Sequence, residues 1–196
     1  MDAWLDFYRP YFPDNETLRR FVVGCEQLKP DDPGHRAKLM MHQGQLLLTI
    51  ADAMGLVVSG REPLKLLFLL IASENISKLH DAYDGEGNSK HYVKRFFNEF
   101  CVPEDKLVIT HGIERCGQES SLEDLIVILY DVRCDVVHEG TYWGFDFATL
   151  ESPSILTGIH LGQVLRVKMR YEEFRDIVAR GIVVATQQVI AQHAAQ

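Results

Sequence analysis

The residues best suited to chemistry in this sequence are Arg133 and His138, which lie five positions apart in the segment LEDLIVILYDVRCDVVHEG (residues 122–140). An arginine carries a permanent positive charge, and a histidine can gain or lose a proton near neutral pH. Work on a phosphodiester needs both properties, because negative charge must be held while a proton moves. The pair therefore indicates a site that acts on a phosphodiester.

The context of this pair carries more weight than its spacing, because Arg36 and His42 form a second pair of similar spacing elsewhere in the chain. Arg133 follows an apolar helical segment and Tyr130, and Gly140 is expected to end the helix. The alternative is an arginine and a histidine that only finish a helix, where positive charges are favoured.

The geometry of a regular helix constrains this hypothesis. Five residues at roughly 100° each place His138 about 140° around the helix from Arg133. The two side chains share a face only if the helix loosens before Gly140 or if Arg133 reaches around. In a twofold dimer, the histidine of one subunit can instead meet the arginine of the other.

The motif LYDVRCDVVHEG resembles the lY-x-x-R-S-x-x-V-H-G segment of the HEPN superfamily, in particular its Apea-like branch. The resemblance implies a helical bundle that forms a homodimer with a shared cleft. It also implies metal-independent endoribonuclease activity without a cofactor, with His138 as general acid or base and Arg133 stabilising the phosphate. The implied setting is stress response, toxin–antitoxin function or antiphage defence, with RNA as substrate and an antitoxin or regulatory protein as partner.

One position departs from the nuclease members of that superfamily. They commonly carry a small polar residue directly after the arginine, whereas this chain has Cys134 there and the acid one position later, at Asp135. This difference and the acidic charge favour an alternative, a non-catalytic module that dimerises and binds RNA, a nucleotide or a partner protein. A third interpretation is a helical dimerisation domain without a ligand.

Several other residues are candidates for supporting roles, each with an alternative. Asp135 is expected either to orient His138 or to balance the charge of Arg133, and Glu139 either to raise the pKa of His138 or to lie on the surface. Tyr130 is part of the motif. Glu74 interrupts an apolar helix, and it faces either the cleft or solvent. A row of cations is a candidate RNA-binding strip, or otherwise the solvated face or the charged guard of an edge strand: Arg166, Lys168 and Arg170.

Hydrophobic periodicity predicts a single, mainly α domain over residues 1–196, an up-and-down helical bundle with a small β-hairpin inserted before the last helix, at about residues 141–171. One helix starts at Pro13-Asp14, and Ser89 and Ser121 are expected to cap two others. Residues 103–120 are expected to be irregular, with a short helical piece near residues 106–109. Further helices are predicted at residues 35–54, ended by Gly55, and at 62–82 and 172–194.

Composition excludes several classes of protein. The net charge of −8 argues against sequence-blind coating of nucleic acid, although a local basic cleft is compatible with it. The four cysteines are widely spaced, which suggests neither a zinc ribbon nor a redox pair. The start of the chain does not resemble a signal peptide, and no apolar run is long enough to span a bilayer. We therefore expect a cytoplasmic protein without a metal or a membrane segment.

Overall fold

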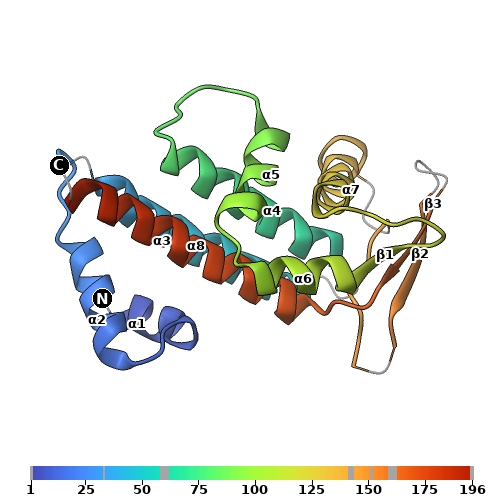
Figure 1. Cartoon of the computed structure of the whole chain (residues 1–196), viewed down its shortest axis with the longest axis horizontal. Coiled ribbons are helices and arrows are strands. Elements are labelled where there is room, and N and C mark those ends of the chain that lie inside the picture. Colours follow the sequence, from blue (N-terminus) through green and yellow to red (C-terminus); the bar gives the residue numbers. More distant parts are fainter. Residues whose placement is uncertain are drawn as a thin grey trace.

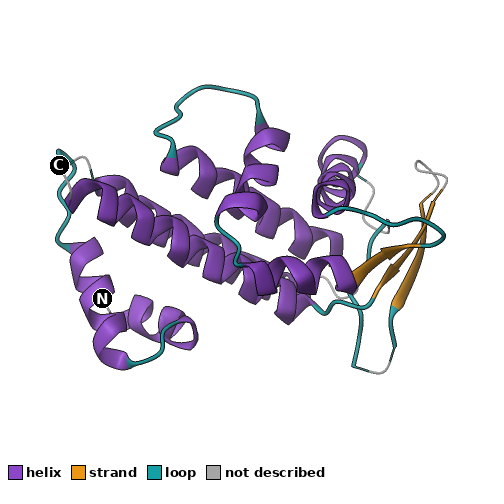
Figure 2. Ribbon diagram, in the orientation of Figure 1, coloured by secondary structure: helices purple, strands orange, loops and turns teal. Residues whose placement is uncertain are grey.

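The computed structural model describes residues 2–32, 34–57, 62–140, 144–150, 152–158 and 163–194. Within these ranges the chain is mainly helical with one small sheet, as predicted (Figure 2). The elements in chain order are α1 (Asp2–Tyr8), η1 (Arg9–Tyr11), α2 (Asn15–Glu26), α3 (His35–Val57), α4 (Glu62–His80), α5 (Ser89–Glu99), α6 (Pro103–Gly112), β1 (Ile113–Arg115), α7 (Leu122–Cys134), η2 (Asp135–Glu139), β2 (Ser154–Gly158), β3 (Gln163–Val167) and α8 (Tyr171–Ala194).

The long helices α3, α4 and α8 pack against one another, and α5 and α7 pack on α4 (Figure 1). Helix α8 runs antiparallel to α3, since Tyr171 at its start bonds to Asp52 near the end of α3. A Cβ atom added to Gly44 of α3 would lie 2.9 Å from Ile182, so only glycine allows α3 and α8 to approach this closely. Other helices pack against this layer of three: α5 and α7 on α4, and α1 and α2 on α3.

Apolar side chains from α4, α5 and α8 form a large part of the core, as their periodicity predicts, and those of α3 and α7 join them. The apolar stretch of α4 is buried, with Leu66 and Leu69 fully inaccessible to solvent. In α5 the aromatic stripe faces inward, and Phe97 stacks on Phe174 of α8 with ring centroids 5.5 Å apart. The aromatic side chains of α5 therefore belong to the core.

Two helix starts follow the predicted capping chemistry. The Asp14 carboxylate accepts a hydrogen bond from the Thr17 backbone N–H at 2.7 Å and begins α2. Ser121 accepts one from the Asp124 backbone N–H, and the Asp124 carboxylate accepts from the Ser121 backbone N–H in return. This reciprocal pair satisfies two donors that a helix start otherwise leaves unpaired, and so it fixes where α7 begins.

The predicted hairpin exists, but it belongs to a three-stranded antiparallel sheet of order β1-β3-β2. Strand β1 pairs Ile113 with Val167, which makes β3 the central strand rather than an edge. The expected extension of the second strand to Tyr171 is wrong, because that residue begins α8. Residues 159–162, at the predicted turn, lie outside the described residues.

Three other predicted boundaries are wrong. The segment expected to be irregular holds α6 as well as β1, because Pro103 and two acidic residues suit a first helical turn. Helix α3 continues past Gly55 to Val57. Ser89 is not the cap of α5, since that position is taken by Asn88 in a left-handed conformation. The Ser89 hydroxyl is used elsewhere, as described below.

The aromatic start of the chain, for which the sequence suggested no element, forms α1 and η1. The Tyr8 ring is fully buried, and its hydroxyl donates to the Met41 carbonyl at 2.8 Å. None of the described helices combines the length and the apolar character that a bilayer crossing requires.

Candidate functional site

Arg133 lies in the last turn of α7, with its guanidinium directed toward α4. Its Nη2 is 3.6 Å from Oε2 of Glu74, and its guanidinium carbon is 5.3 Å from the centre of the Tyr130 ring. Only 17% of the side chain is exposed. The ion pair and the ring together hold the guanidinium in one place at the end of α7.

Glu74 of α4 is the centre of this cluster. Its Oε1 accepts hydrogen bonds from Lys78 Nζ at 2.7 Å and from the Ser89 hydroxyl at 2.6 Å, which leaves Oε2 to face Arg133. The side chain is 9% exposed, so the interpretation of Glu74 as a solvent-facing residue is wrong. Glu74 thus pairs with two cations, Lys78 and Arg133.

The helix changes from α to π geometry between Arg133 and His138, because the π-helical turn η2 begins at Asp135 and includes His138. Gly140 ends this turn in the left-handed conformation (φ 65°), and its N–H bonds to the Asp135 carbonyl. Bonds between residues five apart widen a helix, so the five positions from Arg133 to His138 span a smaller angle than the 140° of a regular α-helix. The loosening before Gly140 that the motif requires is therefore present.

The side chains of Arg133 and His138 nevertheless do not meet within the part of the chain that the structure describes. Arg133 turns to Glu74 and Tyr130, whereas His138 is exposed on η2. Asp135 is half-buried and Glu139 is exposed, and the roles suggested for both remain predictions.

Tyr130 connects the parts of this cluster. It is half-buried, and its ring lies against Arg133 while its hydroxyl interacts with Ser89 and Cys134. Burial raises the pKa of the Tyr130 hydroxyl, although the positive charge of Arg133 lowers it. The tyrosine is therefore a neutral support for the arginine.

The cations of the predicted RNA-binding strip each lie next to a carboxylate. Lys168 pairs with Glu114, and Arg170 lies 3.4 Å from Glu173. Arg166 lies opposite Glu114 in the pairing of β1 with β3. An edge-strand guard is wrong because β3 is central. The exposure of Arg166 and Lys168 agrees with the other alternative, a solvated face, and the RNA-binding role of the strip remains a prediction.

Sequence reasoning missed two members of the Glu74 cluster. Lys78 lies four residues after Glu74, which is the spacing at which opposite charges meet on a helix, so this signal was available. Ser89 comes from another helix and resembles an ordinary cap. Its contact with Glu74 depends on how α4 and α5 pack, which a local pattern does not report.

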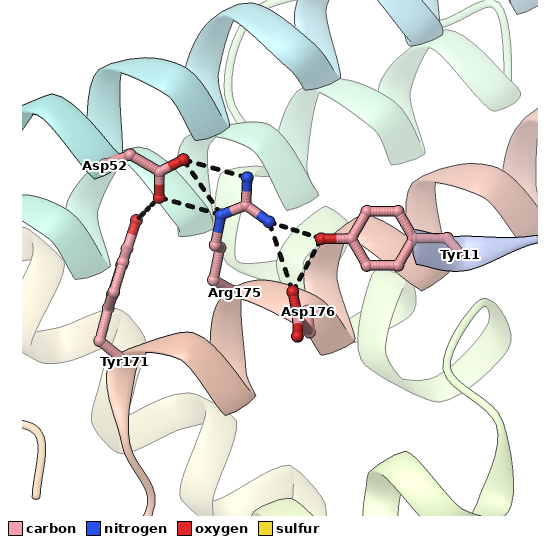
Figure 3. Close-up of polar contacts among 5 residues, drawn as sticks. All are labelled: Tyr11, Asp52, Tyr171, Arg175 and Asp176. Atoms are coloured by element: carbon pink, nitrogen blue, oxygen red, sulfur yellow. Dashed lines mark hydrogen bonds and ion pairs between the residues drawn. The ribbon is translucent and has the colours of Figure 1, made fainter. Parts of the chain in front are cut away.

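A second polar network, also absent from the sequence-based prediction, joins η1, α3 and α8 (Figure 3). Arg175 makes a bidentate interaction with Asp52, in which Nε is 2.9 Å from Oδ1 and Nη2 is 3.0 Å from Oδ2. Its Nη1 donates to the Tyr11 oxygen. Tyr11 donates to Asp176 at 2.7 Å and Tyr171 to Asp52 at 2.6 Å. Burial and the accepting carboxylates raise the pKa of both tyrosines, so both remain donors.

This second network supports the fold. We expect Arg175→Met to lower the free energy of unfolding by about 1–2 kcal/mol, because it removes charged hydrogen bonds while both carboxylates keep a tyrosine donor. Denaturant titration measures the change. Arg20→Met, which removes an exposed pair with Glu16, is the matched control and should cost about 0.5 kcal/mol or less. Equal losses in the two variants would contradict the assigned role.

Two surface hollows, of about 770 and 650 Å³, lie beside the sheet, and neither is lined by Arg133 or His138. Within the described ranges, no three His, Cys, Asp or Glu side chains are grouped so as to hold a metal ion. The cluster around Glu74 is the candidate site because it brings together Arg133 and Tyr130 of the motif.

No family model matches the chain, and neither a curated protein nor a solved structure matches it.

Proposed function

We propose that this protein is a metal-independent endoribonuclease of the HEPN type. The single observation that carries the proposal is the π turn η2, which begins two residues after Arg133 and includes His138. Single π turns within helices occur frequently at functional sites. Here the turn follows an apolar helix and carries an exposed histidine five residues after an arginine that Glu74 and Tyr130 hold in place.

The charges of the cluster suit the proposed reaction. Arg133 is oriented by Glu74, while Lys78 and Ser89 occupy the other oxygen of that carboxylate. The guanidinium can therefore offer its remaining N–H groups to a phosphate oxygen. His138 would move a proton at the ribose 2′-hydroxyl or at the leaving 5′-oxygen. The 2′-oxygen forms the new bond to phosphorus as the 5′-oxygen leaves, giving a 2′,3′-cyclic phosphate.

The proposed site is completed by a second copy of the chain. Within one protomer Arg133 faces α4 and His138 faces solvent, so a twofold axis near η2 would bring the histidine of one copy to the arginine of the other. A homodimer is thus part of the proposal, as is RNA as substrate. An antitoxin or another regulatory protein is the proposed partner.

One observation favours the alternative of a non-catalytic module that binds RNA, a nucleotide or a partner protein. Arg133 is mostly buried and already has a carboxylate beside it, as an arginine with a purely structural role would. Binding of RNA without cleavage would support this second function.

The proposal is tested with end-labelled single-stranded RNA in the presence of EDTA. We expect the parent protein to cut the RNA, to leave a 2′,3′-cyclic phosphate, and to leave the matched 2′-deoxy oligonucleotide intact. Arg133→Ala should lower the rate about 100-fold, because a donor to the developing negative charge is lost. The variant should still fold, since Glu74 keeps Lys78 and Ser89.

Arg19→Ala, on the exposed face of α2, is the matched control and should cut at the parental rate. Equal cleavage by the parent and Arg133→Ala would indicate a contaminating nuclease and overturn the proposal. Cleavage of the 2′-deoxy strand, or loss of all cleavage in EDTA, would overturn the proposed mechanism.

A further inference from the structure

Lys90, in the first turn of α5, lies beside the candidate site. Its Nζ is 5.6 Å from the centre of the Tyr130 ring, the same ring against which the Arg133 guanidinium packs at 5.3 Å. Lys90 and Arg133 come from different helices, and one aromatic side chain thus brings two cations together. Lys90 belongs to the exposed surface, whereas Arg133 belongs to the interior of the cluster.

Lys90 is available to a ligand because its present partner holds it weakly. Its Nζ is 3.1 Å from Oδ1 of Asp131, and the two side chains are 45% and 40% exposed. An ion pair this exposed typically contributes about 0–1 kcal/mol. A phosphate bound next to Arg133 can therefore draw the lysine away from Asp131 at little cost.

The charge around Tyr130 differs from that of the whole protein. The chain has a net charge of −8. Lys78, Lys90 and Arg133 nevertheless come together around Glu74 and Tyr130. An acidic protein repels RNA over most of its surface, so a group of cations marks where a strand can approach.

The sheet is less suited to this task. Its exposed cations face carboxylates of the same surface, with Lys168 on Glu114 and Arg170 on Glu173. Lys90, in contrast, shares the Tyr130 ring with Arg133. The first turn of α5 is therefore the better-placed contact for a strand held at Arg133.

We propose that Lys90 binds a backbone phosphate of single-stranded RNA next to the phosphate held by Arg133. This inference rests on the proposed function, since it assigns Lys90 to the substrate of the same site. Lys90 takes no part in the proton transfer. It contributes to affinity and to the position of the strand, equally in the ground state and in the transition state.

The test measures binding separately from cleavage. Fluorescence anisotropy of a labelled single-stranded RNA is recorded with His138→Ala protein, which leaves the strand intact, and with the same protein carrying Lys90→Met. We expect the Kd to rise about 5-fold and the slope of log Kd against log salt concentration to fall by about 0.7, the change for one lost phosphate contact on a single strand. In the same His138→Ala protein, the conservative variant Lys90→Arg should keep the Kd and the salt slope of the protein with Lys90.

Lys94→Met is the matched control. Lys94 lies one turn further along α5 and pairs with Glu123, so this variant also removes one lysine and one surface ion pair. It should leave the Kd within about 2-fold and the salt slope unchanged, since the phosphate contact is kept. Equal effects of the Lys90 and Lys94 variants would overturn the inference.

Kinetics separate this inference from the proposed function. In the otherwise unchanged protein, Lys90→Met should raise KM about 5-fold and leave kcat the same, because uniform binding is lost. If the parent binds RNA through Lys90 but never cuts it, the nuclease proposal fails and the assignment of Lys90 stands. If the parent neither binds nor cuts RNA, both fail.

Discussion

Replacement of His138 by alanine is expected to lower the rate of RNA cleavage by about 100- to 10,000-fold, the range over which a positioned acid or base accelerates a reaction. The histidine is exposed on η2, so the loss of its ring should leave the fold intact. Single-turnover cleavage of labelled RNA measures the rate. RNA binding by the variant should remain close to that of the parent.

His111→Ala is the matched control, because His111 is also an exposed histidine in the last turn of a helix, here α6. It should cut RNA at the parental rate. If the His138 and His111 variants are equally active, the histidine has no role in the chemistry and the assigned mechanism is wrong.

A mixture of the Arg133→Ala and His138→Ala variants shows whether the site is shared between two protomers. Arg133→Ala and His138→Ala are each expected to keep no more than about 1% of the parental activity alone. If the dimer exchanges subunits and the site takes one residue from each copy, an equal mixture should recover about a quarter of the parental activity, since half of the dimers are mixed and each holds one intact site. No recovery despite demonstrated exchange would place both residues of the site in one protomer.

The largest expected effect on stability comes from Phe97→Ala. The Phe97 ring is fully buried, stacks on Phe174 at 5.5 Å and meets Phe96 edge to face at 5.3 Å. Its truncation removes the Phe97–Phe174 contact between α5 and α8 and leaves a cavity, which should lower the free energy of unfolding by about 3–5 kcal/mol. Urea titration followed by circular dichroism measures this loss.

Asn98→Ala, at the exposed neighbouring position, is the control for that measurement. It should change the free energy of unfolding by no more than about 0.5 kcal/mol. A loss below about 1 kcal/mol for Phe97→Ala would mean that α5 does not form part of the cooperative core.

Local chemistry made several parts of the fold predictable. Asp14 and Ser121 begin their helices as expected because a cap depends on residues within one turn. The buried interior of α4 and the aromatic face of α5 follow from periodicity, which depends only on the spacing of apolar residues.

Features that depend on distant partners were not predictable in the same way. Strand β1 has three residues, too few to show alternation, and it exists because β3 pairs with it. Tyr171 alternates correctly with the strand before it, yet it starts α8 and bonds to Asp52. Ser89 has the composition of a cap, but its hydroxyl bonds to Glu74 of another helix.

For the candidate site, the sequence identified Arg133, Glu74 and Tyr130, which the structure brings together. Glu74 was recognisable because a charged residue inside an apolar helix needs a partner. The sequence did not show which oxygen of Glu74 pairs with Lys78 and which with Arg133, because that depends on the packing of α4, α5 and α7.

The two arginine–histidine pairs of the chain differ in the pitch of the helices that contain them. Arg36 and His42 lie in α3, which continues unbroken, and the Arg36 guanidinium donates to the last carbonyls of α4, those of Leu79 and His80. Arg133 and His138 instead lie on either side of a change in pitch. A pattern search that counts only intervening residues treats the two pairs as near equals. Adding pitch to such a search would separate an arginine that ends a neighbouring helix from one placed to receive a ligand.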